Sequence, residues 1–211
     1  MTKPLVHILR RILLLSDGRD KILKIIQYVS KILLIHRALS VNSAKKANNL
    51  ASSFSTGRKI LRLAHFLDGI EELYTNKQSL FSFFSVLVGI LNDVSDDFVC
   101  LAKIGFLDKK WSDKFTPVSD RLWYLSVYLD VWDCLDGLQS IRKKAEKDPA
   151  QQAAIKEKLR IQRVSLIKLL ADYVFCSIDV FKLDWERTQV YAGLVAAVLG
   201  SYKLYVKHSN C

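Results

Sequence analysis

Residues 57–74, GRKILRLAHFLDGIEELY, repeat apolar side chains with the period of an α-helix. Wound at about 100° per residue, the segment gathers an apolar arc made of Ile60, Leu63, Ala64, Phe66, Leu67, Ile70, Leu73 and Tyr74. The opposite face carries Arg58, Arg62, His65, Asp68 and Glu72. We therefore predict one continuous amphipathic helix. Such a helix either covers a soluble core or lies in a membrane interface, and in the second case the apolar arc is the membrane-inserting face.

Helix-breaking residues are scarce along the whole chain, with 8 Gly and 3 Pro among 211 residues. The alternation of apolar and polar residues that is typical of β-sheets hardly occurs. The mean hydropathy of +0.12 is high for a soluble domain and low for a protein with many membrane spans. These features predict an all-α protein, a membrane-associated bundle of amphipathic and short hydrophobic helices.

Two uncharged runs, residues 78–92 and 188–202, are the best candidates for hydrophobic helices, and each has fifteen residues. An ordinary spanning helix needs roughly 18–20. Residues 190–206 could span a bilayer only if Lys203 extended toward its surface. The alternative is a buried helix of a bundle. One side of this segment carries small residues suited to close helix packing, namely Gly193, Ala197, Gly200 and Ser201.

The positive charge of the chain is concentrated in its first third. The formal net charge is +11, and residues 1–67 hold thirteen Lys or Arg but only Asp17 and Asp20. This region indicates an anionic partner. Nucleic-acid binding would favour aromatic rings among the basic residues, and few occur, so we predict anionic lipid headgroups and no nucleic acid. The predicted lipid contacts are Arg19, Lys24, Lys31, Arg58, Lys59 and Arg62.

We interpret the chain as one domain, 1–211, with four regions. They are a basic amphipathic region (1–76), hydrophobic helices (77–141), a charged linker (142–158), and C-terminal helices with a hydrophobic segment (159–211). Within them we predict long helices over 19–39, 120–140 and 159–181, a loop or weak helix over 42–55, and a charged break over 109–117. Residues 3–15 are either a short first helix or the start of a mitochondrial presequence.

No pattern of catalytic or metal-binding residues occurs in the sequence. The four histidines are isolated, and the four cysteines (Cys100, Cys134, Cys176 and Cys211) form no CxxC pair. We expect no enzyme, metal or cofactor. Asp93, Asp96 and Asp97 are predicted to cap helices in a connection. Asp130, Asp133 and Asp136 are predicted to form the solvated side of a helix, the alternative being a polar channel.

Four segments, in order, resemble the peroxin 11 family of peroxisomal membrane proteins. They are GRDKILKIIQY (18–28), RKILRLAHFL (58–67), LAKIGFL (101–107) and GLVAAVLGSYKLY (193–205). The second is similar to the amphipathic helix with which that family remodels membranes. The sequence departs from the family pattern at Cys100, where an aromatic residue is common, and at Ala64 and Ala102, where Gly is common.

The resemblance implies a protein of the peroxisomal membrane, or of the glycosomal membrane in some lineages, with both termini in the cytosol. Such proteins insert an amphipathic helix into the cytosolic leaflet, form homo-oligomers and elongate the organelle. They also help to recruit the dynamin-type fission machinery and its membrane adaptor. Three alternatives remain open: a metabolite channel of the same membrane, a soluble helical adaptor, and RNA binding by the basic third.

Overall fold

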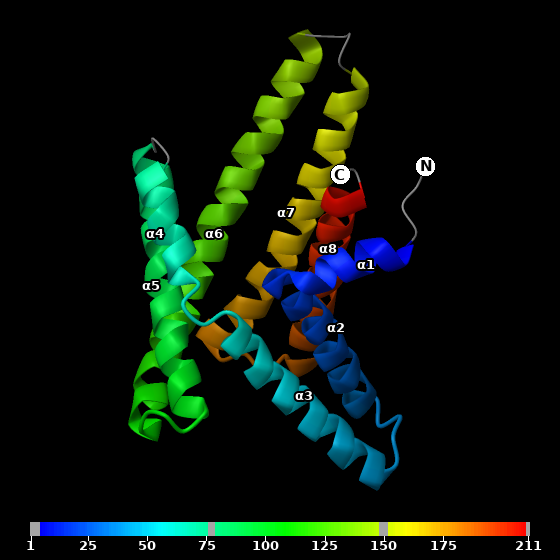
Figure 1. Cartoon of the computed structure of the whole chain (residues 1–211), viewed down its shortest axis with the longest axis vertical. Coiled ribbons are helices and arrows are strands. Elements are labelled where there is room, and N and C mark those ends of the chain that lie inside the picture. The colour runs from blue at the N-terminus through cyan, green and yellow to red at the C-terminus, as the bar shows by residue number, and fades with distance from the viewer. Residues whose placement is uncertain (1–4, 76–78, 148–151, 210–211) are drawn as a thin grey trace.

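The computed structural model describes residues 5–75, 79–147 and 152–209, and these residues form eight helices (Figure 1). The prediction of an all-α fold is confirmed. The helices are α1 (Leu5–Leu14), α2 (Ser16–Ile35), α3 (Val41–Leu61), α4 (Phe66–Thr75), α5 (Leu80–Lys103), α6 (Lys109–Lys147), α7 (Gln152–Phe181) and α8 (Glu186–Ser209).

Six of the helices pack in a closed ring. In the order α5, α6, α7, α8, α2, α3 and back to α5, each helix contacts the next. Figure 1 shows the long α6–α7 hairpin between the α4–α5 hairpin on one side and the α2–α3 hairpin on the other. Helix α1 lies against α2 and α8, whereas α4 contacts only α5 among the described helices. The least enclosed helix is therefore the one that contains much of the predicted amphipathic segment.

The apolar core lies in the seams between neighbouring helices and is made mostly of small side chains. The largest fully buried side chains are those of Cys100 and Cys176. Many larger apolar side chains face outward instead, among them Phe83, Trp132 and Val198. The space inside the ring is lined by charged residues. Soluble bundles usually show the reverse distribution.

Helix boundaries differ from the predictions at both ends of α6, which at its C-terminal end extends into the charged linker predicted over 142–158, as does the start of α7. The charged break predicted over residues 109–117 is wrong, because α6 runs from Lys109 through Pro117 to Lys147. Stacked rings fasten the start of α6 to α5: Phe98 lies 5.5 Å from Trp111 and 4.6 Å from Phe115 between centroids. Residues 42–55 are helical, the second of the two alternatives, and Ser40 caps α3 by accepting from the Ser43 N–H at 3.5 Å.

Among the described residues, no helix is both long enough and apolar enough to cross a membrane, and this holds for α8 as well.

Candidate functional site

The predicted amphipathic segment is not one helix. Helix α3 ends at Leu61, α4 begins at Phe66, and Ala64 between them has φ = +64°. The prediction of a continuous helix over 57–74 is therefore wrong. Left-handed backbone costs an L-residue other than Gly roughly 1–2 kcal/mol, so surrounding contacts must hold this break, which we call the α3–α4 break (residues 62–65).

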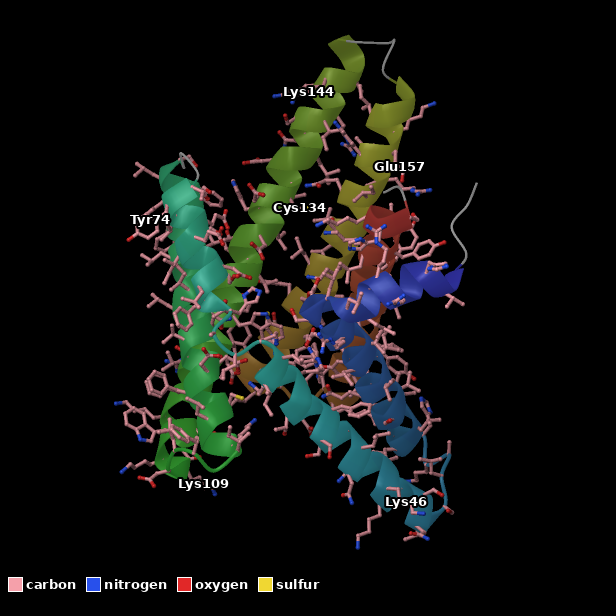
Figure 2. The ribbon with its side chains drawn as sticks, in the orientation of Figure 1. Lys46, Tyr74, Lys109, Cys134, Lys144 and Glu157 are labelled. Atoms are coloured by element: carbon pink, nitrogen blue, oxygen red, sulfur yellow. The ribbon has the colours of Figure 1, made fainter. Side chains whose placement is uncertain are left out.

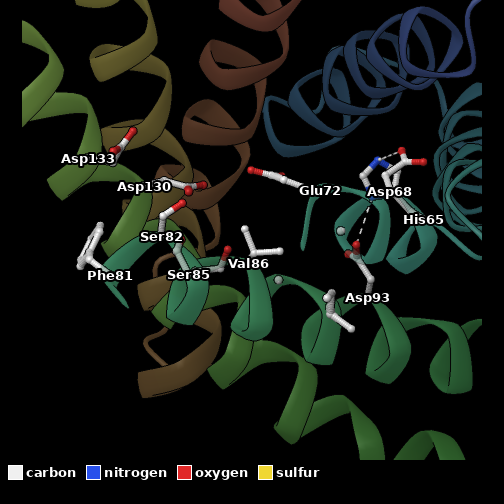
Figure 3. Close-up of a pocket in the computed structure, with 14 residues that line it drawn as sticks. His65, Asp68, Glu72, Phe81, Ser82, Ser85, Val86, Asp93, Asp130 and Asp133 are labelled. Carbon is white, nitrogen blue, oxygen red and sulfur yellow. Dashed lines mark hydrogen bonds and ion pairs between the residues drawn. The ribbon is translucent and has the colours of Figure 1, made fainter. Parts of the chain in front are cut away.

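Three carboxylates of α5 hold the α3–α4 break. Asp97 Oδ2 accepts from the Ala64 N–H at 3.0 Å, Asp93 Oδ2 lies 3.1 Å from His65 Nδ1, and Asp96 pairs with Lys59 and, at 3.7 Å, with Arg62. Figure 3 shows the imidazole of His65 between Asp93 and Asp68. Burial raises the pKa of Asp97, and the hydrogen bond from Ala64 offsets only part of the rise.

These three acids are not where the sequence placed them. We predicted helix capping in a connection, but Asp93, Asp96 and Asp97 lie inside α5. Their spacing puts them on adjacent positions of one helical face, from which they reach across to the α3–α4 break. The polar groups exposed by that break are thus satisfied by a neighbouring helix rather than by the local sequence.

The apolar arc is divided by the break and by contact with α5. Phe66, Ile70 and Leu73 are half-buried, as is Ala64. Gly69 permits the close approach of the two helices, since a Cβ there would lie 2.7 Å from Ile90 Cγ1. The remaining residues of the arc are exposed, namely Ile60, Leu63, Leu67 and Tyr74. Tyr74, which is 88% exposed, lies near the outer end of α4 (Figure 2).

A pocket of about 360 Å³ lies beside α4, between α5 and α6. Ser82, Ser85, Glu72 and Asp130 line it together with Asp133 (Figure 3). Asp130, Asp133 and Asp136 are all exposed, the placement expected for the solvated side of α6. The pocket therefore has an acidic, polar wall open to solvent.

The six basic residues predicted to contact lipid divide into two groups. Lys24, Arg58 and Lys59 form ion pairs within the bundle, with Asp172 at 3.2 Å, with Asp20 at 3.0 Å, and with Asp96. The other three are less enclosed. Arg62 is half-exposed, Arg19 is exposed, and Lys31 Nζ lies 5.6 Å from the centre of the Tyr28 ring.

The ion pairs form a buried network between α2, α3 and α7. Asp20 is 3% exposed and accepts from Arg58, which also donates to Gln27 Oε1 at 2.9 Å. Burial acts to raise the pKa of Asp20, but the charges of Arg58, Arg62 and Lys21 outweigh it, and the net pKa is lowered. Pairing on this scale explains how so many charges are tolerated inside the bundle.

The sequence analysis missed the α7 half of this network. Asp172 binds both Lys24 and, at 3.0 Å, Lys168. Burial acts to raise the pKa of Asp172, and the two lysines lower it overall. A signal was present, because Lys168 and Asp172 stand four residues apart in an otherwise apolar stretch of helix.

The small residues of α8 face α2. A Cβ on Gly193 would lie 2.4 Å from Tyr28 Cζ, and one on Gly200 would lie 3.3 Å from Lys21 Cε. Ala197 is fully buried, and the half-buried Ser201 donates its hydroxyl to the Ala197 carbonyl at 3.0 Å. The segments 18–28 and 193–205, far apart in the sequence, are therefore packed together.

The described residues contain no group of three or more His, Cys, Asp or Glu placed to hold a metal ion. Cys100, Cys134 and Cys176 are buried free thiols. Burial raises the pKa of all three, for Cys176 to about 12, so they are poor nucleophiles at neutral pH. Cys211 lies outside the described residues. The arrangement is that of a helical bundle with a surface amphipathic segment.

Comparison with known proteins identifies the family. The sequence matches Peroxisomal biogenesis factor 11 (PEX11) over residues 6–205. It is 24% identical to Peroxisomal membrane protein 11A of Arabidopsis thaliana, covering 90% of this chain and 88% of that protein. It is 28% identical to Peroxisomal membrane protein 11-4 of Oryza sativa subsp. indica, covering 89% and 90%. No solved structure matches.

The chain belongs to the PEX11 family, as its four sequence segments indicated. It is accordingly a peroxisomal membrane protein that belongs to a family of peroxisome biogenesis factors, and it is not an enzyme.

Proposed function

We propose that this protein remodels the peroxisomal membrane by inserting the apolar arc of residues 57–74 into the cytosolic leaflet. The observation that carries the proposal is the placement of this segment. Leu63 and Leu67 are exposed, and α4 is held by α5 alone among the described helices. Helix α4, which has one neighbour, can leave it at lower cost than any helix of the ring. Residues 57–61 belong to α3 and can follow only if the ion pairs of Arg58 and Lys59 open.

Insertion requires the α3–α4 break to straighten, because only a continuous helix presents the whole arc to lipid. Burying eight apolar side chains at roughly 1–1.5 kcal/mol each gives about 8–12 kcal/mol before ordering costs. Phe66, Ile70 and Leu73 already bury part of their surface on α5, so the net gain is smaller. Basic residues near an anionic surface add about 1 kcal/mol each.

We extend the proposal to the role that the resemblance to the PEX11 family implies, which is elongation of the organelle before its division. Area added to one leaflet favours curvature, and self-association concentrates it, so the membrane elongates and becomes a substrate for dynamin-type fission proteins and their adaptor. Both termini face the cytosol in this proposal. Contact with anionic headgroups falls first to Arg19, which is exposed. Lys31 and Arg62 line the space inside the ring, and Lys24, Arg58 and Lys59 are paired there, so these five join only if the ring opens.

The test uses the full-length protein with liposomes containing anionic lipid. Wild type is expected to bind and tubulate them, and Leu63→Glu with Leu67→Glu is expected to abolish tubulation, because two charges would enter the apolar interface. A matched control, Val41→Glu with Leu50→Glu, changes two exposed apolar residues of α3 outside the arc. Equal tubulation by wild type and the first variant would refute the proposal.

A channel for metabolites is the second candidate, and the pocket beside α4 favours it. Its wall is polar and acidic, with Asp130 and Asp133 at its edge. Conductance across planar bilayers that falls when both residues are changed to Asn would support this candidate. Tubulation without any conductance would exclude it.

A further inference from the structure

The space enclosed by the ring of six helices is a cavity of about 410 Å³, and its wall carries an excess of positive charge. Residues from all six helices line it. Eight of the lining side chains are Lys or Arg and five are Asp, an excess of three positive charges. The volume lies within the range of sites that bind small molecules.

The carboxylates in the wall leave part of this charge uncompensated. Asp20, Asp96 and Asp172 each pair with two or more cations. Two further cations, Lys31 and Lys103, have no carboxylate within ion-pair distance among the described residues. Burial raises the pKa of the remaining acids, Asp120 and Asp179, which weakens their contribution of negative charge.

A second observation also indicates a missing partner. The side-chain oxygen of Asn92 is buried, has no hydrogen-bond partner among the described residues, and belongs to a residue of the cavity wall. A buried acceptor of this kind costs free energy unless a donor reaches it. Once the Asn92 side chain turns toward the cavity, a ligand hydroxyl group would supply that donor, whereas a bare anion would not.

We propose that the cavity binds a phosphate monoester that carries hydroxyl groups, either as a free molecule or as the headgroup of a phospholipid. A phosphate monoester carries a charge of about −1.5 to −2 at neutral pH and would compensate most of the excess. Arg58 and Arg62 offer guanidinium groups suited to phosphate oxygens. Lys31 and Lys103 supply ammonium groups that form no ion pair with a carboxylate of the described residues. The side-chain oxygen of Asn92 accepts a hydrogen bond from a hydroxyl group of the ligand.

Binding is linked to proton uptake. Burial lowers the pKa of Lys24 to about 8 and also lowers that of Lys103. An anion in the cavity favours the charged form of both lysines. At pH 8 the complex should therefore take up a fraction of a proton, which calorimetry in two buffers of different ionisation enthalpy measures directly. Binding to exposed lysines would show no such uptake.

The experiment titrates the full-length protein in detergent with glycerol 3-phosphate, and separately with phosphatidylcholine vesicles containing phosphatidylinositol 4-phosphate, whose headgroup carries both a phosphate monoester and hydroxyl groups. Lys31→Gln with Lys103→Gln should weaken binding at least tenfold. The control, Lys45→Gln with Lys46→Gln, removes the same charge from exposed positions of α3 and should change it less than twofold. Asn92→Leu should remove any preference for glycerol 3-phosphate over inorganic phosphate.

The two titrations separate the sources of the ligand. Binding of the free ester alone indicates a soluble metabolite, and binding of the vesicles alone, with the same dependence on Lys31 and Lys103, indicates a headgroup. The proposal would be overturned if the Lys31/Lys103 and Lys45/Lys46 double variants lost the same amount of binding affinity, or if the wild type bound neither probe. If the double variant fails to fold, Lys103→Gln alone replaces it, since Lys103 is the last residue of α5 and is only partly buried. Tubulation by the arc does not depend on this result.

Discussion

The contact between α2 and α8 is made close by small side chains, whereas the contact between α4 and α5 leaves large apolar side chains half-exposed. Gly193 lies against the Tyr28 ring without room for a methyl group. Helix α4, by comparison, rests on α5 through Phe66, Ile70 and Leu73, none of which is fully buried. The first contact fixes the ring, and the second holds a segment that can be released.

The two contacts also differ in how they use charge. Around α2, charges pair inside the bundle, where separating them would leave a buried ion without a partner. At the α3–α4 break, Asp93, Asp96 and Asp97 bind groups at the edge of the molecule, and His65 is exposed. Water can replace the contact of the exposed His65 at low cost, whereas Asp97 is partly buried. The comparison predicts large stability effects in the first region and functional effects in the second.

The largest effect is expected from Gly193→Val. The added side chain would overlap the Tyr28 ring, because a Cβ alone would lie 2.4 Å from it. Overpacking of this kind costs up to about 3 kcal/mol, and urea denaturation followed by circular dichroism measures it. Gly57→Ala is the control, since no atom lies within 4 Å of its Cβ position. That change should stabilise α3 by about 0.5–1 kcal/mol. A destabilisation by Gly193→Val below 1 kcal/mol would contradict a tight α2–α8 contact.

A second effect is a pH dependence that belongs to Lys24. Its pKa is lowered by burial to about 8 and has its ordinary value of 10.5 in the unfolded chain. Between about pH 8 and 10 the unfolded state holds a proton that the folded state has released, so this group makes stability rise with pH. The slope is at most about 1.4 kcal/mol per pH unit.

The lysine is isolated by comparing wild type with Lys24→Met in denaturation curves across this range. The raised pKa of the Cys176 thiol acts in the opposite direction above about pH 9, but it does so in both proteins. The stability of wild type minus that of the variant should therefore rise with pH. For the exposed control Lys45→Met, the difference in unfolding free energy from wild type should not change with pH. If the difference for Lys24→Met did not change with pH either, Lys24 would not be desolvated.

Much of the fold could be predicted from the sequence, because helical periodicity and the scarcity of Gly and Pro are local properties. The small-residue side of 193–201 was visible in the same way. The α3–α4 break was not, since residues 57–74 favour one helix by their own pattern. It depends on Asp97 and Ala64, which are far apart in the sequence and meet only when α5 packs beside α3.

The charged interior was equally hidden. Lys24, Arg58 and Lys59 have the residue type and spacing of a basic surface, and only the ring of helices brings Asp20, Asp96 and Asp172 to them. Local sequence shows that a side chain is charged, but not which element will face it. For this reason the lipid-binding residues were predicted as a single set, and the structure divides that set in two.

The smallest change in stability, with the most direct bearing on release, is expected from Ala64→Gly. Ala64 has φ = +64°, a conformation that Gly adopts without penalty. The substitution should stabilise the broken form by about 1 kcal/mol, and it should disfavour the straightened helix by a similar amount, because Gly is a poor helix former. Both effects oppose insertion, so liposome binding should weaken by about tenfold or more while the native fold is retained.

Ala44→Gly is the matched control, because it places the same substitution inside α3, away from the α3–α4 break. It should lower helix stability and leave liposome binding within about twofold. Binding curves for wild type, Ala64→Gly and Ala44→Gly, measured on one set of anionic liposomes, show whether insertion requires the α3–α4 break to straighten. Unchanged binding by Ala64→Gly would show that α4 reaches the membrane with the break intact. In that case only the exposed residues of the arc, Ile60, Leu63, Leu67 and Tyr74, would form the inserted face, and the carboxylates of α5 would keep their contacts in the bound state.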